Sequence, residues 1–286
     1  MKNIKKISSI FLCLILTLCL FFGCAKSGDS NIDENIIERD EYVAFFETDD
    51  DADCALIHIK DNNILIDTGE KDDAKDIMNF LEKNSINKID YLIISHFDKD
   101  HCGGVEKILQ NYQVVNFLRP KYVEDKKASQ KALEAVKNKG VTETVIDSVT
   151  EMRFDTISLC FYPTVNEFDN KPSNNSSLIV KLTYLEKSML FTGDIESERV
   201  NEIMSGDTSY LDCDLLKVPY HGRPVEDEQS FVNAVSPEIS IVTGSGSKVK
   251  KNIKSLGDTL GTVYYTDDGT IIVYFDYSTG LTAVQD

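Results

Sequence analysis

The sequence of 286 residues predicts an α/β domain in which two β-sheets pack together and helices cover their outer faces. About ten short apolar segments have the pattern of strands, and four or five stretches have the apolar spacing of helices, in mixed order. A content of 42% hydrophobic and 27% charged residues is typical of a globular protein and excludes disordered, collagen-like and disulfide-dense classes. No period of roughly 20 to 50 residues is visible, which argues against a solenoid.

The first 23 residues have the pattern of a secretory signal. Three lysines within the first six residues precede an apolar run at 10–22, which is too short to span a membrane. The run ends at Gly23-Cys24 and resembles a bacterial lipobox, in which a small residue precedes a cysteine that becomes lipid-modified. We therefore expect a lipoprotein signal peptide at 1–23, and an extracytoplasmic protein that Cys24 anchors to the cell membrane by fatty chains. The alternative is a short anchor helix that is never cleaved.

Residues 24–40 are polar, acidic and without periodicity, which predicts a flexible tether before one folded domain at 41–286. The whole chain has 30 Lys and Arg against 48 Asp and Glu. Without residues 1–23 the balance is 27 against 48, a formal charge of −21. Such a charge disfavours binding to long polyanions. No protein partner can be identified from the sequence.

Apolar or alternating stretches bounded by turn residues mark the elements of the domain. The segments expected to form strands are 41–48, 54–60, 63–67, 91–95, 152–162, 178–191, 215–218, 239–242, 263–265 and 271–275. The segments expected to contain helices are 74–81, 128–136, 196–204, 226–235 and 248–256.

The loop after the buried strand at 91–95 concentrates potential metal ligands. Two of the chain's four histidines and two aspartates fall within six residues, as His96, Asp98, Asp100 and His101. Imidazole and carboxylate groups at this spacing, followed by a glycine pair, are typical of a metal-binding loop. The alternative is a polar turn in which Asp100 caps the next helix.

Three further segments end an apolar strand with a polar group and a glycine. They carry Asp67 at 64–69, Asp194 at 189–194 and His221 at 215–222. Each segment alone could be a plain turn. Ligands collect at the carboxyl ends of strands in sheet-based enzymes, however, so the set of segments together predicts a functional site.

The order of these motifs resembles the metallo-β-lactamase fold metallo-hydrolases. The motifs are DTG at 67–69, SHFDKDHCGG at 95–104, FTGD at 191–194 and LKVPYHG at 216–222. Within that family, the chain is similar over about residues 42–276 to the hydrolase domain of ComEC-type competence proteins and their stand-alone relatives. The resemblance implies a four-layer αββα sandwich, which agrees with the independent tally of strands and helices.

The resemblance also implies a role for each polar residue of the motifs. Asp67 matches the aspartate that orients the metal loop by hydrogen bonds. Many relatives supply another histidine near 174–177, where this chain has none. The implied ligands are His96 and Asp98 for a first ion, Asp100 and His101 for a second, Asp194 as the bridging carboxylate and His221 as a further ligand.

A set of three His and three Asp can hold two divalent ions. Two ions about 3.5–4 Å apart lower the pKa of a bridging water and stabilise both oxygens of an in-line displacement, so metal-bound hydroxide is the expected nucleophile of a hydrolysis. A carboxylate at position 98, where many relatives have His, leaves both Zn²⁺ and Mn²⁺ as candidates. Asp100 and Tyr220 are candidate catalytic residues, and Lys217 and Arg223 are candidates for pairing with phosphate. For the last three, the alternative is ordinary packing or a solvated charge.

The chain also departs from the ComEC-type pattern. Tyr220 replaces the first histidine of a His-His-Gly-Ser segment, 244–247 lacks the histidine of a Gly-His-Pro segment, and no membrane channel accompanies the domain. The resemblance implies an exported, metal-dependent phosphodiesterase or nuclease acting on DNA or on a smaller phosphoester. The alternatives are a hydrolase of the same fold that acts on a lactam, thioester or lactone, and a non-catalytic metal-binding lipoprotein.

Overall fold

The computed structural model describes residues 41–286 except 277, 279 and 286. The expected signal peptide at 1–23, the tether at 24–40 and the lipidation site at Cys24 lie outside the described residues. Within the described part of the chain, no helix combines the length and the apolar character that crossing a bilayer requires.

The first sheet contains eight strands in the order β15-β14-β1-β2-β3-β4-β5-β6. Strands β3 to β6 run parallel to one another, and the other neighbours in the sheet are antiparallel. Its strands are β1 (Tyr42–Phe45), β2 (Ala55–Ile59), β3 (Asn62–Ile66), β4 (Lys88–Ile93), β5 (Gln113–Pro120), β6 (Thr142–Ile146), β14 (Ile271–Asp276) and β15 (Gly280–Gln285).

The second sheet contains seven strands in the order β13-β12-β11-β10-β9-β8-β7. Here β10 to β13 run parallel and β7 to β10 run antiparallel. Its strands are β7 (Thr150–Phe154), β8 (Ile157–Tyr162), β9 (Ile179–Tyr184), β10 (Lys187–Phe191), β11 (Leu215–Lys217), β12 (Ile239–Val242) and β13 (Thr262–Tyr265).

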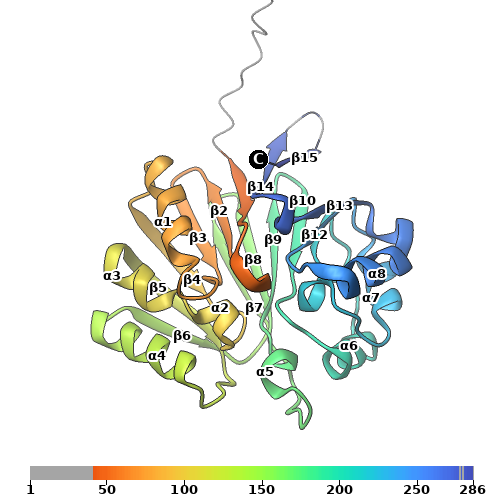
Figure 1. The fold of residues 1–286 in the computed structure, drawn as a ribbon, viewed down its shortest axis with the longest axis horizontal. Helices are drawn as coiled ribbons and strands as arrows, with labels where there is room; N and C mark the ends of the chain where they lie inside the picture. Colours follow the sequence, from red (N-terminus) through yellow and green to blue (C-terminus); the bar gives the residue numbers. More distant parts are fainter. Residues whose placement is uncertain (1–40, 277, 279, 286) are drawn as a thin grey trace, which may run out of the picture. The chain divides into compact units, whose positions relative to one another are not determined.

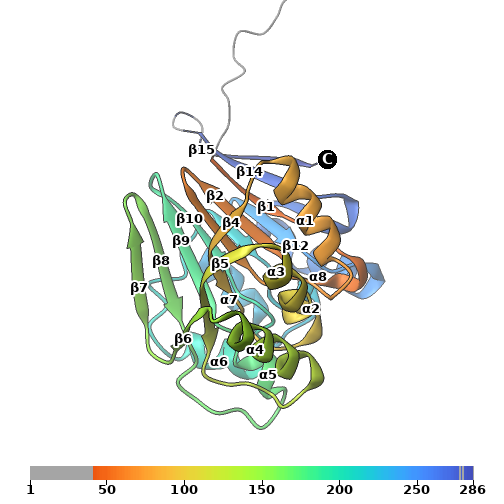
Figure 2. The same cartoon turned by 90° about the vertical axis from the view of Figure 1, so that its left-hand side faces the viewer.

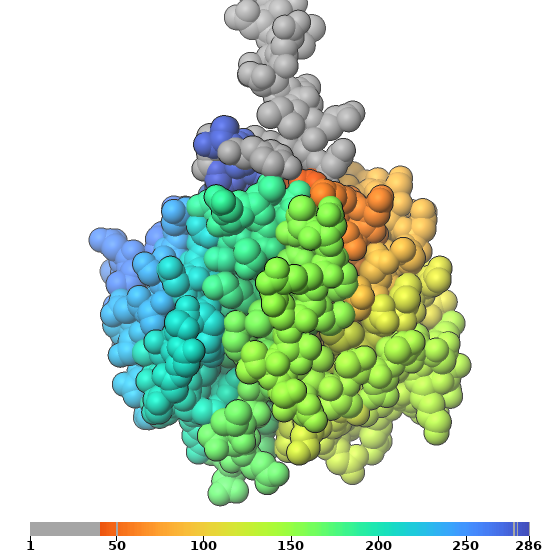
Figure 3. Space-filling model, turned by 180° about the vertical axis from the view of Figure 1, so that it is seen from behind, coloured from red at the N-terminus to blue at the C-terminus, as the bar shows by residue number. Residues whose placement is uncertain are grey.

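Helices cover the outer face of each sheet, as Figures 1 and 2 show. The first sheet carries α1 (Ala74–Lys83), α2 (Lys99–Cys102), α3 (Val105–Asn111) and α4 (Lys127–Lys139). The second sheet carries α6 (Ser197–Met204), α7 (Glu228–Val235) and α8 (Gly246–Leu256). Short 3₁₀ turns lie at Asp49–Asp51, Pro219–Gly222, Gly257–Leu260 and Thr266–Asp268. The four-residue helix α5 (Pro172–Asn175) follows a loop that projects at the end of the fold away from β15 (Figures 1 and 3).

Three apolar cores hold these layers together. The central core joins the facing sides of the two sheets, with residues such as Ile57 and Leu159 fully buried. A second core lies between the first sheet and α1 to α4, and a third lies between the second sheet and α6 to α8. In β8 the burial alternates along the strand, as expected where one face meets the core. The four-layer αββα sandwich predicted from the sequence is therefore confirmed.

The structure contains elements that the sequence did not reveal. Strands β5 and β6 and helix α3 belong to the first sheet and its cover, yet none was predicted. Strand β5 was missed because no Gly or Pro separates it from the preceding helix. Helix α3 ends at Asn111, and β5 begins at Gln113. The expected boundary signal is absent there.

The parallel strands determine where polar loops collect. In the first sheet β3 and β4 lie side by side, and in the second sheet β10, β11 and β12 do. Parallel strands of one sheet end on the same side of that sheet. In each sheet, the segments that follow these strands therefore begin next to one another. The predicted site residues belong to these segments.

Burial of Glu228 predicts a pH-dependent stability. This side chain at the start of α7 is 3% exposed, and Asn252 Nδ2 donates to its Oε2 at 2.8 Å. Burial raises its pKa from 4.5 to about 7, so the folded chain binds this proton more tightly than the unfolded chain does. Glu228 therefore makes its full contribution to the free energy of unfolding below pH 4.5. This contribution is lost as the pH rises through 7, and the total loss is about 3 kcal/mol at most.

Replacing Glu228 by Gln should therefore stabilise the fold at pH 8 by about 1–3 kcal/mol relative to its effect at pH 5. Urea denaturation of both proteins at the two pH values measures the difference. An equal change in unfolding free energy at both pH values would contradict the shifted pKa.

Candidate metal centre

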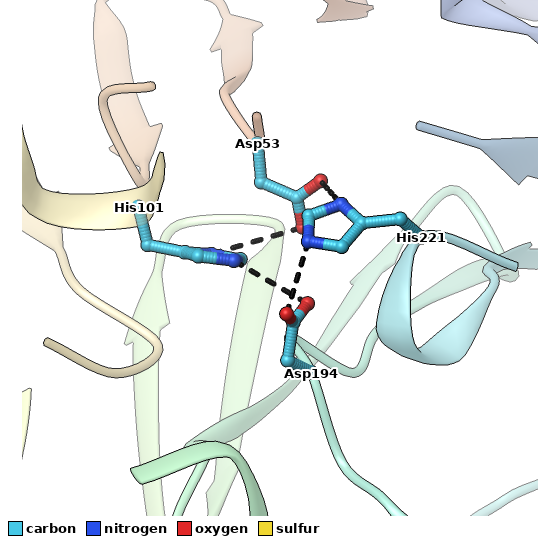
Figure 4. Close-up of side chains that lie close together, drawn as sticks. All are labelled: Asp53, His101, Asp194 and His221. Carbon is cyan, nitrogen blue, oxygen red and sulfur yellow. Dashed lines mark ion pairs between the residues drawn. The ribbon is translucent and has the colours of Figure 1, made fainter. Parts of the chain in front are cut away.

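Four buried side chains from four separate segments converge at the common sheet edge (Figure 4). Asp53 precedes β2, His101 lies on α2, Asp194 follows β10, and His221 lies in the 3₁₀ turn after β11. One ligand atom from each lies within 4.8 Å of all the others. Three of the four, His101, Asp194 and His221, were predicted ligands.

Both imidazoles of this group face Asp194 with the same nitrogen. His101 Nε2 lies 3.3 Å from Asp194 Oδ1, and His221 Nε2 lies 2.9 Å from Asp194 Oδ2. On the other side of each ring, His101 Nδ1 lies 2.9 Å from Asp67 Oδ2 and His221 Nδ1 lies 3.2 Å from Asp53 Oδ1. A carboxylate only accepts hydrogen bonds, so both Nδ1 atoms carry a proton. When no cation is bound, the facing Asp194 oxygens favour a proton on each Nε2 as well. A divalent ion would replace these protons and bind the Nε2 lone pairs.

Asp67 organises the loop as the motif predicts. Its carboxylate accepts hydrogen bonds from Ser95 N and Ser95 Oγ, both at 2.7 Å, and from His101 Nδ1. Asp67 itself has a φ of 59°, which is rare for a residue with a side chain. Such backbone conformations persist where surrounding contacts fix them, and they cluster at functional sites.

The remaining predicted ligands lie around the tight group. His96 is buried, and its ring centroid lies 4.0 Å from that of His101. Asp100 Oδ2 lies 3.7 Å from His221 Nε2. Asp98 Oδ1 instead accepts hydrogen bonds from Ser173 Oγ at 2.6 Å and from Lys126 Nζ at 3.0 Å. His96 and Asp100 thus lie beside the tight group. One oxygen of Asp98 is occupied by hydrogen bonds from Ser173 and Lys126.

Lys217 and Asp53 form an ion pair inside the centre. The Lys217 side chain is 5% exposed, and its ammonium group contacts Asp53 Oδ2 and donates to Gly193 O at 3.2 Å. The sequence predicts that Lys217 pairs with a substrate phosphate. In the structure its side chain is instead buried and pairs with Asp53. Sequence reasoning missed Asp53 as a site residue. Its signals were its place just before the expected strand at 54–60 and the resemblance of the segment 53–57 to the opening strand of the ComEC-type domain.

Tyr220 and Arg223 flank the His221-Gly222 pair in the turn after β11. Together with Asp51 and Lys248 they line a cleft of about 850 Å³. Arg223 pairs with Asp51 at 3.2 Å, and its guanidinium carbon lies 5.3 Å from the centroid of the Tyr220 ring. Tyr220 and His221 both have positive φ values, 49° and 55°, which turn the chain sharply here. A Cβ on Gly244 would collide with the backbone of His221, so this turn needs glycine as its neighbour.

The carboxylates set the charges of the centre when no cation is bound. Burial opposes the charged form of His221, but Asp194 and Asp53 outweigh it and raise the pKa to about 10. Burial likewise opposes ionisation of Asp194, but His221 and His101 outweigh it and lower the pKa of this carboxyl well below its usual range. For His96, burial and the neighbouring charge of His101 outweigh the carboxylates and lower the pKa to about 4. Histidine protons thus compensate the carboxylates in place of a cation.

The donor set fits a divalent metal ion. Among the described residues, five buried atoms of this centre have no hydrogen bond: Asp53 Oδ1, His96 Nε2, His101 Nε2, His221 Nε2 and Asp194 Oδ1. Unsatisfied buried polar atoms cost about 1–3 kcal/mol each, so a cluster of them requires a partner. Imidazole and carboxylate together suit Zn²⁺ and Mn²⁺, as the sequence predicts.

Comparisons with known proteins agree with this geometry. The family model of the Metallo-beta-lactamase superfamily matches residues 48–245. ComE operon protein 3 of Bacillus subtilis is 28% identical over 174 residues, which cover 59% of this chain and 22% of that protein. Competence protein ComA of Neisseria gonorrhoeae is 21% identical over 201 residues, which cover 69% of this chain and 26% of that protein. The chain therefore spans about a quarter of the length of these relatives, and the resemblance to competence proteins is confirmed.

Solved structures show the same fold. The metallo-beta-lactamase fold protein YhfI from Bacillus subtilis has a TM-score of 0.53 at 13% identity, over 79% of this chain and 97% of that chain. CmlA, a diiron beta-hydroxylase from Streptomyces venezuelae, has a TM-score of 0.52 at 14% identity, over 86% of this chain and 54% of that chain. These likenesses concern the fold alone. Because the family model covers more than half of the sequence, the chain belongs to the metallo-beta-lactamase superfamily.

Proposed function

We propose that the protein is a metal-dependent hydrolase of phosphodiesters, a nuclease or phosphodiesterase of the ComEC type. The observation that carries this proposal is the buried group in which His101 Nε2 and His221 Nε2 face the Asp194 carboxylate, with His96 beside His101. A bound divalent ion would polarise a phosphoryl oxygen and lower the pKa of a coordinated water. His101, His221 and Asp194 would hold it, with His96 and Asp100 beside them.

The chain's own residues supply the remaining parts of the reaction. Asp100 is largely buried, and burial raises its pKa, but His221 at 3.7 Å and the charge of His101 outweigh this and lower the pKa to about 2. The carboxylate is therefore ionised at neutral pH and can accept a proton from water. Tyr220, in the adjacent cleft, can donate a hydrogen bond to a leaving oxygen.

Positive side chains beside the centre favour a phosphate-containing substrate despite the acidic composition. Lys126 pairs with Asp98 at 3.0 Å and with Glu124 at 2.7 Å, and Arg223, which pairs with Asp51, lines the cleft together with Lys248. Each of the two lysine-rich segments, 126–131 and 248–254, thus places one residue near the site. A local positive rim can offset the formal charge of −21 for a phosphoester, which includes DNA as one candidate.

The direct test is hydrolysis by the metal-loaded domain. Single-stranded DNA and bis-p-nitrophenyl phosphate are incubated with the wild-type protein and with His101→Ala, each supplied with Mn²⁺ or Zn²⁺. We expect cleavage of at least one substrate by the wild type only. Equal rates for both proteins on both substrates would overturn the proposal, and turnover of a lactam, thioester or lactone instead would select another hydrolase of this fold.

Arg223 provides a test of substrate binding. Replacing it by Ala should raise KM for a phosphodiester about tenfold, because a charge-assisted hydrogen bond contributes about 1.5–3 kcal/mol, while kcat changes little. Arg153→Ala is the matched control, since that exposed arginine pairs with Glu151 on β7, outside the cleft. An unchanged KM for Arg223→Ala would exclude Arg223 from phosphate binding.

We also propose that the mature chain is held at the outer face of the cell membrane through Cys24. The support is the lipobox-like sequence at the end of the apolar run. Labelling of cells with a radioactive fatty acid should mark the wild type but not Cys24→Ala, which we expect to leave the membrane fraction. Retention of the label in Cys24→Ala would contradict lipidation at this residue.

A further inference from the structure

Lys217 brings a fixed positive charge into the centre. It ends strand β11 and is 4% exposed, so its side chain is buried. It contacts Asp53 Oδ2, donates to Gly193 O at 3.2 Å, and lies 3.7 Å from Asp194 Oδ1. A buried ammonium group is stable only when paired, and here Asp53 is its nearest partner.

Asp53 connects this ammonium group to a predicted metal ligand. While Oδ2 contacts Lys217, Oδ1 lies 3.2 Å from His221 Nδ1. Thr243 Oγ1 lies 3.0 Å from the same nitrogen. Nδ1 thus has a hydrogen bond with Thr243 and a charged neighbour in Asp53, and Nε2 points toward Asp194 and Asp100.

The same pair makes Asp53 a poor metal ligand, although it lies in the tight group. A cation bound by Asp53 would have to displace the Lys217 ammonium group from its buried partner or lie beside it. Either arrangement costs free energy, because like charges repel strongly away from solvent. Asp53 is therefore better suited to orient His221 than to bind the ion.

We propose that Lys217 and Asp53 are positioning residues that hold His221 in the Nδ1-protonated form, with Nε2 free for the metal. The proposal rests on the proposed function, since it assigns His221 to the metal. Lys217 fixes the orientation of the Asp53 carboxylate, and Asp53 fixes the proton of His221. Partners of this kind around metal-binding histidines contribute about 10- to 100-fold to metal affinity.

The decisive variant is Asp53→Asn. Its amide oxygen would face Lys217, so its NH₂ group would face His221 Nδ1 and favour the ring form that carries the proton on Nε2. We expect zinc affinity, measured by competition with a chromogenic chelator, to fall at least about tenfold. We also expect the Nδ1–H signal of His221 in ¹H–¹⁵N spectra of the zinc-loaded protein to be lost.

Asp214→Asn is the matched control. Asp214 pairs with Lys187 at 2.6 Å in the same sheet, outside the metal centre, and its loss should leave both readouts unchanged. Weaker zinc binding by Asp53→Asn with an unchanged Nδ1–H signal would show that Asp53 is itself a ligand, and would overturn the proposal. So would unchanged affinity.

A second variant covers the case in which Asp53→Asn fails to fold. The double variant Asp53→Asn with Lys217→Met removes both charges together, so no unpaired buried charge remains. We expect it to fold and to bind zinc at least about tenfold more weakly than the wild type. Wild-type affinity in the double variant would overturn the proposal, whereas a wild-type protein that binds no metal at all would instead contradict the proposed function.

Discussion

Replacing Asp194 by Asn should abolish metal binding and reduce phosphodiester hydrolysis by at least about 10³-fold. Asp194 faces both His101 Nε2 and His221 Nε2, whereas Asp53, the other carboxylate near both rings, lies on their Nδ1 side. Charge stabilisation by a bound ion contributes several kcal/mol to such a reaction, and about 4 kcal/mol corresponds to that factor. Elemental analysis of the dialysed protein and the rate with bis-p-nitrophenyl phosphate measure the two effects.

The fold should survive this substitution, because the Asp194 backbone N–H donates to Ser177 Oγ at 3.1 Å and does not depend on the carboxylate. Asp214→Asn serves as a control for the loss of an acidic group from the same sheet. Metal content equal to that of the wild type in Asp194→Asn would remove Asp194 from the ligand set.

Replacing Asp67 by Asn should destabilise the metal-free protein by about 3–5 kcal/mol, the usual effect of breaking a buried charged network. Asp67 accepts two hydrogen bonds from Ser95 and one from His101, and an amide cannot accept all three. Asn tolerates the left-handed backbone almost as well as Asp does, so backbone strain does not contribute. Urea denaturation measures the change.

Asp155→Asn provides the comparison. Asp155 also has a positive φ, 52°, but its carboxylate lies at the surface beside Lys60, where an ion pair contributes about 0–1 kcal/mol. Destabilisation of Asp67→Asn by no more than that of Asp155→Asn would mean that Asp67 does not hold the loop.

The parts of the site that the sequence predicts are those encoded within single short motifs. Asp194 and His221 each follow a strand and have glycine beside them, His101 lies in the loop motif after β4, and the structure brings these three together. Local order is enough here, because parallel strands present their carboxyl ends at one edge. The fold class could be predicted because each strand and helix has a local apolar pattern that is visible in the sequence.

The contacts that the sequence does not predict all cross between distant segments. Asp98 looks like a ligand in its motif, but Ser173, 75 residues away, and Lys126 engage one of its oxygens. Asp53 precedes an ordinary strand, and only the packing of the two sheets places it against Lys217. Such pairings depend on register and sheet packing, which no local pattern encodes.

The account depends most on the claim that this centre uses a divalent ion for hydrolysis. The most direct measurement is the rate of bis-p-nitrophenyl phosphate cleavage by protein stripped with EDTA, as Mn²⁺ or Zn²⁺ is added in known equivalents. We predict that the rate rises from background and reaches a plateau at a whole number of ions per chain. A rate that stays at background through several equivalents of both metals, in a protein shown to be folded, would contradict the account.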